Sequence, residues 1–186
     1  MDFEEHVQSS EMVFNGGLVQ VERQQVTLPD HSTATREIVH HQPAVAVLMV
    51  TAAQKMCLVQ QWRSAAKGVT LEIPAGKVEP GETATAAAKR ELNEETRLAT
   101  DQLEPVASFY TSPGFTDEFM TLYVATGLHA VNQALPQDAD EFLHLVELDL
   151  PTALAQVKSG KLADAKTVMA VWYWQSHPEL GVTTNG

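Results

Sequence analysis

Hydrophobic residues first form a dense pattern in the second quarter of the chain. Residues 44–50 are a continuous apolar run, which is typical of a strand covered on both faces. Residues 56–62 follow across a short polar turn and are expected to be its hairpin partner. Residues 69–73 form a shorter predicted strand, which Pro74 and Gly76 end. This part of the chain therefore predicts the centre of a β-sheet.

The pattern changes to a helical one after the turn at residues 80–81. Residues 82–97 are rich in Ala, Glu, Lys and Arg, which favour helices. Later strands are expected at 106–110, 119–125 and 142–148, a helix after Pro151, and a closing helix at about 163–176 that buries Trp172. This order of elements predicts an α/β/α sandwich, in which helices cover a mixed β-sheet.

The first 42 residues differ from the rest of the chain. They contain short β-prone segments at 18–22 and 35–40, and few large apolar residues. Such a segment could hardly form a core alone. We therefore predict an N-terminal antiparallel β element at residues 1–42, in contact with a partner subunit, and a catalytic domain at residues 43–186.

Length and charge exclude several classes of protein. The 186 residues suit one domain with a short appended element. Twelve basic residues against 24 acidic ones give a net charge of −12, which argues against an open electrostatic grip on nucleic acid. The single cysteine, Cys57, excludes an internal disulfide, and the longest apolar run is too short to span a membrane. The expectation is a cytoplasmic protein without nucleic-acid or membrane partners.

Three carboxylates share one face of the predicted helix at residues 82–97. Glu91, Glu94 and Glu95 stand at i, i+3 and i+4. Two charges ~4 Å apart repel by roughly 4 kcal/mol at an effective dielectric constant of about 20. Clustered hard oxygen ligands suit Mg²⁺ or Mn²⁺. The alternative is a solvated acidic face with no site.

The spacing around these acids is long and specific. It consists of Gly76, Glu82, residues 90–92, Glu94, Glu95 and Leu98. This spacing resembles the Nudix box of the nucleoside-diphosphate hydrolases. The departure is Arg97, where the family has a glycine at the helix end. A left-handed cap costs an L-residue roughly 1–2 kcal/mol, so Arg97 predicts either tolerated strain or a different helix exit.

The resemblance extends over residues 35–175 and is closest to the ADP-ribose pyrophosphatase branch. It includes residues 61–63 and 71–77 before the box, Pro113 fifteen positions after Leu98, and residues 162–167. It implies a Nudix-type sandwich, Mg²⁺-dependent hydrolysis of ADP-ribose to AMP and ribose 5-phosphate, and a homodimer with intertwined N-terminal strands. The alternatives are a hydrolase of another nucleoside-diphosphate sugar, such as GDP-mannose, and a non-catalytic Nudix-like ligand sensor.

The resemblance also implies roles for the residues of the box. Glu91 and Glu95 would be direct metal ligands, Glu94 a ligand or close supporter, and the Ala75 carbonyl a further ligand. Arg90 would orient the carboxylates. The remaining residue, Glu82, would tie the preceding loop to the helix. For Arg90 and Glu82 a purely structural role is equally expected.

Substrate contacts are assigned outside the box. Arg63 suits a substrate phosphate, with a rim salt bridge as the alternative, and Glu72 would accept a hydrogen bond from ribose or adenine unless it is a surface acid. Pro113 and Gly114 would shape a loop against the distal ribose, and Arg36 would reach the adenosine side, in the partner's site.

The general base is expected in the acidic loop before the last strand. Glu141 is the first candidate for this role. Asp140 and, within the box, Glu95 are the alternatives, and a plain acidic turn would leave the loop without a catalytic role.

Overall fold

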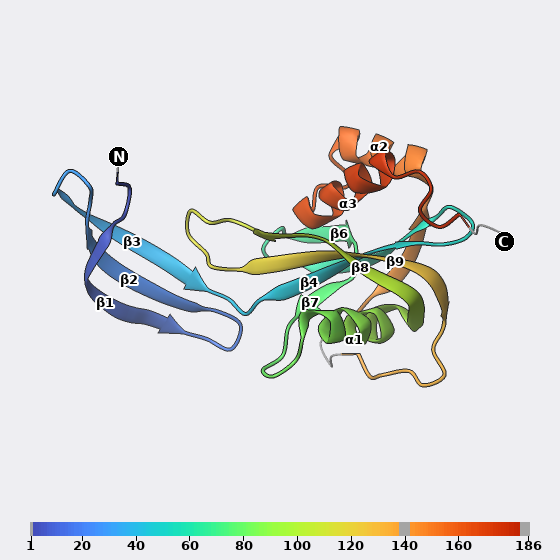
Figure 1. Cartoon of the computed structure of the whole chain (residues 1–186), viewed down its shortest axis with the longest axis horizontal. Coiled ribbons are helices and arrows are strands. Elements are labelled where there is room, and N and C mark those ends of the chain that lie inside the picture. The colour runs from blue at the N-terminus through green and yellow to red at the C-terminus, as the bar shows by residue number, and fades with distance from the viewer. Residues whose placement is uncertain (1, 138–141, 183–186) are drawn as a thin grey trace. The chain divides into compact units, whose positions relative to one another are not determined.

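The computed structural model describes residues 2–137 and 142–182 (Figure 1). The chain forms two compact units, the first of residues 1–43 and 109–120, and the second of residues 44–108 and 121–186. The segment 109–120 thus belongs to the first unit, although it lies within the range that the sequence analysis gives to the catalytic domain.

The first unit is a three-stranded antiparallel sheet with one attached loop. Its strands are β1 (His6–Asn15), β2 (Gln20–Thr27) and β3 (Thr33–His40), in the order β1-β2-β3. The strand β1 was not foreseen, because all its residues are exposed and no burial enforces an alternating pattern. The loop is attached through the Val39 amide, which donates to the Phe115 carbonyl at 2.7 Å.

The second unit is built on a seven-stranded sheet. Its strands are β4 (Ala44–Val50), β5 (Met56–Arg63), β6 (Gly68–Glu72), β7 (Ala75–Lys77), β8 (Leu98–Tyr110), β9 (Phe119–Ala130) and β10 (His144–Leu148). The order is β10-β5-β4-β9-β8, with β6 paired to β5 and β7 to β4. Every residue of β4 is buried, as expected for a continuous apolar run.

Helices cover both faces of this sheet (Figure 1). On one face lies α1 (Ala84–Thr96), and on the other lie α2 (Leu150–Ser159) and α3 (Ala165–Ser176). Alternate residues of β4, namely Val45, Val47 and Met49, share a core cluster with Ala88 and Leu92 of α1. The prediction of an α/β/α sandwich with a mixed sheet is therefore confirmed.

The buried stripe of α3 differs from the prediction. Its buried residues are Thr167, Ala170, Val171 and Trp174, which follow the helical period. Trp172 is 56% exposed, so the expectation that it is buried was wrong. The buried tryptophan is Trp174, about half a helical turn further on. No helix in the described part of the chain is long and apolar enough to cross a membrane.

Candidate active site

The helix α1 buries two of its three predicted metal ligands. Thr83 caps the helix by accepting a hydrogen bond from the Ala86 amide at 3.2 Å. Glu91 is 8% and Glu95 is 4% exposed, because they lie beside Ala87, Ala88 and Leu92, which pack on the sheet. A solvated acidic face does not describe these two carboxylates.

Arg90 joins three carboxylates of the box. Its Nη1 donates to Glu91 Oε1 at 2.7 Å and to Glu94 Oε2 at 2.8 Å. Its Nε and Nη2 donate to the Glu82 carboxylate at 3.1 and 3.0 Å, and Nη2 also donates to the Lys77 carbonyl at 2.9 Å. The Glu82 hydrogen bonds, followed by those of Glu91 and Glu94, raise the pKa of Arg90. One guanidinium therefore ties the preceding loop to α1 and faces three negative charges.

Gly76 makes room for the Glu91 carboxylate. A Cβ at position 76 would lie 1.9 Å from Glu91 Oε1, so any larger residue here would have to displace the Glu91 carboxylate. The backbone beside Ala75, whose carbonyl is a predicted ligand, therefore runs directly against this carboxylate.

The described residues contain no group of three His, Cys, Asp or Glu side chains already arranged to hold a metal ion. Two of the predicted ligands, Glu91 and Glu94, hydrogen-bond the same Arg90 nitrogen. The donor set still fits a hard divalent cation, because its donor atoms are oxygens. The carboxylates also carry more negative charge than the one guanidinium that they contact can neutralise. The close approach at Gly76 adds backbone to the same place.

A second charged cluster surrounds Glu72, which is 3% exposed. Arg63 Nε donates to Glu72 Oε1 and Arg63 Nη2 to Glu72 Oε2, both at 2.8 Å. Thr70 Oγ1 donates to Oε1 at 2.6 Å, and Lys166 Nζ donates to Oε2 at 2.5 Å. Lys166 also donates to Asp164 Oδ1 at 3.0 Å. The cluster thus joins β5, β6 and the start of α3.

Glu72 is held as a carboxylate. Burial acts to raise its pKa, but the hydrogen bonds from Arg63 and the charge and hydrogen bond of Lys166 outweigh burial and lower the pKa to about 2. Glu95 and Asp164 act with Glu72 on the Arg63 guanidinium and raise its pKa. Arg63 is therefore close enough to sense a carboxylate of the box.

Arg97 takes the left-handed conformation, with φ 62° and ψ 25°. Of the two expectations for this departure from the box, tolerated strain is confirmed. The Arg97 guanidinium donates to the Leu135 carbonyl, and two bonds of the Asn93 side chain, each at 3.0 Å, hold Gln133 and Leu135. These contacts offset part of the strain.

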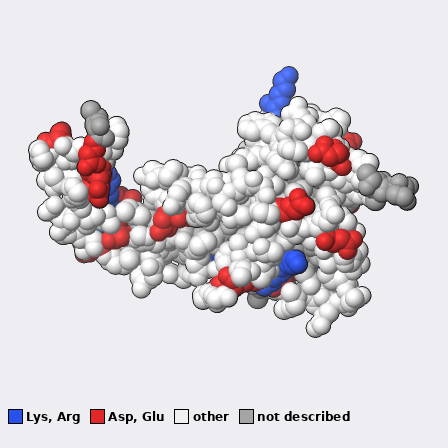
Figure 2. Space-filling model, in the orientation of Figure 1, with Lys and Arg blue, Asp and Glu red and all other residues white. Residues whose placement is uncertain are grey.

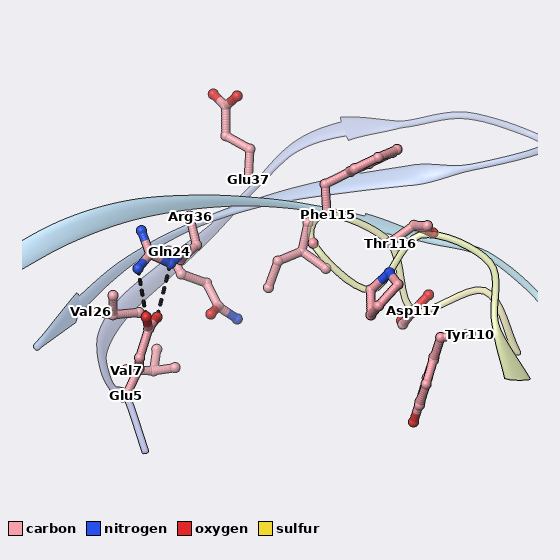
Figure 3. A pocket seen from close by; sticks show the side chains of 13 residues that line it. Glu5, Val7, Gln24, Val26, Arg36, Glu37, Tyr110, Phe115, Thr116 and Asp117 are labelled. Carbon is pink, nitrogen blue, oxygen red and sulfur yellow. Dashed lines mark hydrogen bonds and ion pairs between the residues drawn. The ribbon is translucent and has the colours of Figure 1, made fainter. Parts of the chain in front are cut away.

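The first unit contains a pocket of about 430 Å³, which Arg36, Pro113 and Gly114 line. Figure 3 shows Arg36 and Phe115 among its lining side chains. Glu5 and Arg36 face each other across a double hydrogen bond, in which Arg36 Nε donates to Glu5 Oε2 at 2.9 Å and Arg36 Nη2 to Oε1 at 2.5 Å. Phe115 also lines the pocket and is 57% exposed.

His40 fixes the loop that carries Pro113 and Gly114. Its Nδ1 lies 2.6 Å from Asp117 Oδ2, and its Nε2 lies 2.8 Å from Glu22 Oε2. Hydrogen bonds to Asp117 and then to Glu22 raise the pKa of His40, against the effect of burial. The imidazolium form satisfies both carboxylates, because both of its ring nitrogens are donors.

The structure groups the predicted residues into three sets. Glu82, Glu91 and Glu94 each contact Arg90, Arg63 is bound to Glu72, and Arg36 shares a pocket with Pro113 and Gly114. Glu141 and Asp140 lie outside the described residues. Sequence reasoning gave no role to Thr70, Asp164 and Lys166, although the resemblance at residues 162–167 was a signal for the last two.

The mixed sheet between helices, with buried glutamates on α1 behind a glycine, defines a domain of the Nudix type. The NUDIX domain model matches residues 40–171, and the chain belongs to this family. The resemblance found in the sequence is thereby confirmed.

Relatives and a solved structure agree with this membership. The chain is 45% identical to a methanol dehydrogenase activator of Bacillus methanolicus, over 96% of both chains. It is 40% identical to an ADP-ribose pyrophosphatase of Bacillus subtilis, over 92% of this chain and 93% of the other. A crystal structure of an ADP compounds hydrolase shares the fold, with a TM-score of 0.84, 20% identity, and coverage of 97% of this chain and 100% of that one.

Proposed function

We propose that this protein hydrolyses the pyrophosphate of ADP-ribose to AMP and ribose 5-phosphate with Mg²⁺. The observation that carries the proposal is the box itself, where Glu91 and Glu95 are buried on α1 and Arg90 joins Glu82, Glu91 and Glu94. The similarity to the ADP-ribose pyrophosphatase of Bacillus subtilis supports the choice of substrate.

Glu91, Glu94, Glu95 and the Ala75 carbonyl would hold the ion, with Mn²⁺ as a substitute for Mg²⁺. A bound divalent ion supplies charge compensation at the diphosphate and lowers the pKa of an attacking water. Arg90 keeps the carboxylates oriented by charge-assisted hydrogen bonds. Acidic side chains spread over the drawn face, with few basic ones (Figure 2). Ions therefore have to offset the net charge of −12 before a diphosphate binds.

Arg63 would bind a phosphate of the substrate. Its side chain is 45% exposed, and guanidinium matches phosphate geometry. Glu72 would act through Arg63, because its carboxylate already accepts four hydrogen bonds from the protein.

We assign the general base to Glu141, with Asp140 and Glu95 as alternatives. Water attack at one phosphorus needs a group that takes the proton. Replacing Glu141 with Gln should lower kcat by about 100-fold or more while KM changes little. A small change in kcat would move the role to another acid.

Arg36, in the pocket of the first unit, would reach the adenosine side of the substrate in the partner's site. Pro113 and Gly114, which line the same pocket, would shape their loop against the distal ribose. Arg36 is paired with Glu5, so to contact the substrate it would have to bind Glu5 and the substrate at the same time. Arg36→Met should raise KM by about threefold to tenfold with little change in kcat.

A homodimer is proposed from the surface of the first unit. Val7, Met12, Val13, Phe14 and Leu18 are 39–64% exposed, which is typical of surfaces that are covered in an assembly. Light scattering should give about twice the chain mass of 20.3 kDa. A monomer at all concentrations would contradict the proposal. The cytoplasmic location stays a prediction.

A substrate panel tests the reaction. With Mg²⁺, AMP release from ADP-ribose should be faster than GMP release from GDP-mannose or UMP release from UDP-sugars. Glu95→Gln should lower kcat by about 1000-fold with an unchanged melting temperature, whereas the exposed Glu79→Gln should retain activity. Turnover of GDP-mannose alone would overturn the substrate, and normal turnover by Glu95→Gln would overturn the metal site.

A second candidate is a regulatory role, as an activator of a dehydrogenase. The 45% identity to the methanol dehydrogenase activator favours it. The test is the rate of an NAD-dependent alcohol dehydrogenase with and without this protein. If Glu95→Gln activates as well as the unmodified chain, a non-catalytic ligand sensor is favoured over hydrolysis.

A further inference from the structure

Lys166 is a buried charge for which the proposed reaction has no use. Its side chain is 10% exposed, whereas lysine is almost never buried unless it is paired. Its ammonium lies between Glu72 Oε2 and Asp164 Oδ1. Burying a charge without such partners costs free energy, so Lys166 depends on Glu72 and Asp164 for its position.

The buried position of Lys166 is explained by the hydrogen bonds that the Glu72 carboxylate accepts. Oε1 accepts from Arg63 and Thr70, and Oε2 accepts from Arg63 and Lys166. A carboxylate offers about four acceptor positions, so all of them are used within the protein. Glu72 is therefore an internal anchor, and the group that it anchors on the exposed side is Arg63.

Asp164 fixes Lys166 from the opposite side. Its Oδ2 accepts from the Thr167 amide at 3.0 Å and caps α3, while its Oδ1 accepts from Lys166. The positive end of the α3 dipole offsets part of the Asp164 charge. Lys166 is thus held at a defined place between the carboxylates of Asp164 and Glu72.

We propose that Lys166 is a positioning residue, which shares the charge of Glu72 and so leaves the charge of Arg63 available to the diphosphate of the substrate. Arg63, Glu72, Lys166 and Asp164 together carry no net charge, whereas without Lys166 the same cluster would carry one net negative charge. The remaining nitrogen, Arg63 Nη1, hydrogen-bonds no described residue. This inference rests on the proposed function, since it concerns the phosphate contact of Arg63.

The test separates binding from chemistry. Lys166→Met should raise KM for ADP-ribose by about tenfold, with kcat within about threefold of the unmodified enzyme, because a ground-state phosphate contact is weakened. Lys166→Arg, which keeps the charge, should restore KM to within about threefold. The exposed Lys161→Met removes the same charge elsewhere and should leave KM unchanged.

A variant that fails to fold does not end the test. Lys166→Gln keeps a donor without the charge and replaces Lys166→Met if melting curves show that Lys166→Met is unfolded; its KM should rise to the same extent. An unchanged KM in a folded variant, or a fall in kcat alone, would overturn the positioning role while the proposed function stands. If the unmodified chain releases no AMP from ADP-ribose, the proposed function fails first, and the inference fails with it.

Discussion

The two compact units of this chain use the same kinds of charged pairs in different surroundings. In the second unit, Glu72, Glu91 and Glu95 are at most 8% exposed, and each lies near a guanidinium. In the first unit, the side chains of Arg23 and Glu37 form a pair at 3.0 Å but are 48% and 63% exposed. The interaction between two opposite charges becomes stronger as water is excluded from around them. The second unit is therefore where a substitution of a charged residue should be felt.

Two clusters show this contrast with opposite signs. Glu72 is one anion between the cations Arg63 and Lys166, whereas His40 is one cation between the anions Glu22 and Asp117. The first cluster is stable when the carboxyl group is ionised, and the second when the imidazole is protonated. The contribution of the Glu72 cluster to stability should therefore be lost as the pH falls, and that of the His40 cluster as the pH rises.

Among the comparisons of the two units, the largest expected effect comes from adding one methyl group to the box. Gly76→Ala should lower kcat/KM by about 100-fold, because the new Cβ occupies the place of the Glu91 carboxylate. Gly17→Ala, in the first unit, meets nothing within 4 Å and should leave kcat/KM unchanged. Steady-state kinetics with ADP-ribose measures both, and equal activity of the two variants would refute the close packing at Gly76.

A stability comparison of two arginines should give the next largest effect. Arg90→Leu should lower the free energy of unfolding by about 2 kcal/mol, because Glu82, Glu91 and Glu94 lose a shared, partly buried partner. Arg23→Leu should change it by less than about 0.5 kcal/mol. Urea unfolding measures both values. Similar losses in the two variants would mean that burial does not distinguish the pairs.

The opposite pH responses can be tested by the same method. The low pKa of Glu72 makes its stabilisation, on the order of 3 kcal/mol, complete above pH 4.5 and lost as pH falls through about 2. The raised pKa of His40 makes its stabilisation complete below pH 6.5 and lost as pH rises through the raised value.

Between pH 5 and 9, the loss of stability in His40→Gln should therefore shrink as the pH rises, since the unmodified imidazole becomes neutral. The loss in Glu72→Gln should stay constant over the same range. A constant loss in His40→Gln would contradict the assignment of an imidazolium between two carboxylates.

The smallest effect concerns two left-handed residues. His31 has φ 69° and is exposed, and no side-chain hydrogen bond of His31 is found among the described residues. His31→Gly should stabilise the protein by up to about 1 kcal/mol. Arg97→Gly should be neutral within about 1 kcal/mol, because it relieves strain but loses the bond to the Leu135 carbonyl. A clear gain in Arg97→Gly would show that this bond contributes little.

Local patterns were enough to predict much of the second unit. The apolar run at 44–50 fixed the buried strand β4, because both of its faces must be covered. The composition of residues 82–97 predicted the helix α1, and Glu82 and Glu91 of the box both contact Arg90 in the structure. These features depend on neighbours within about two turns of helix or one strand, which the period of the sequence records directly.

Contacts between distant segments were decided only by the tertiary structure. The sequence does not reveal that Lys166 meets Glu72, 94 positions away, or that the loop at 109–120 joins the first unit through Val39. It also left Glu72 open as a ligand contact or a surface acid, whereas the fold surrounds it with four donors. Such pairings follow from how helices and strands pack in space, and no local period encodes which distant side chain fills a given place.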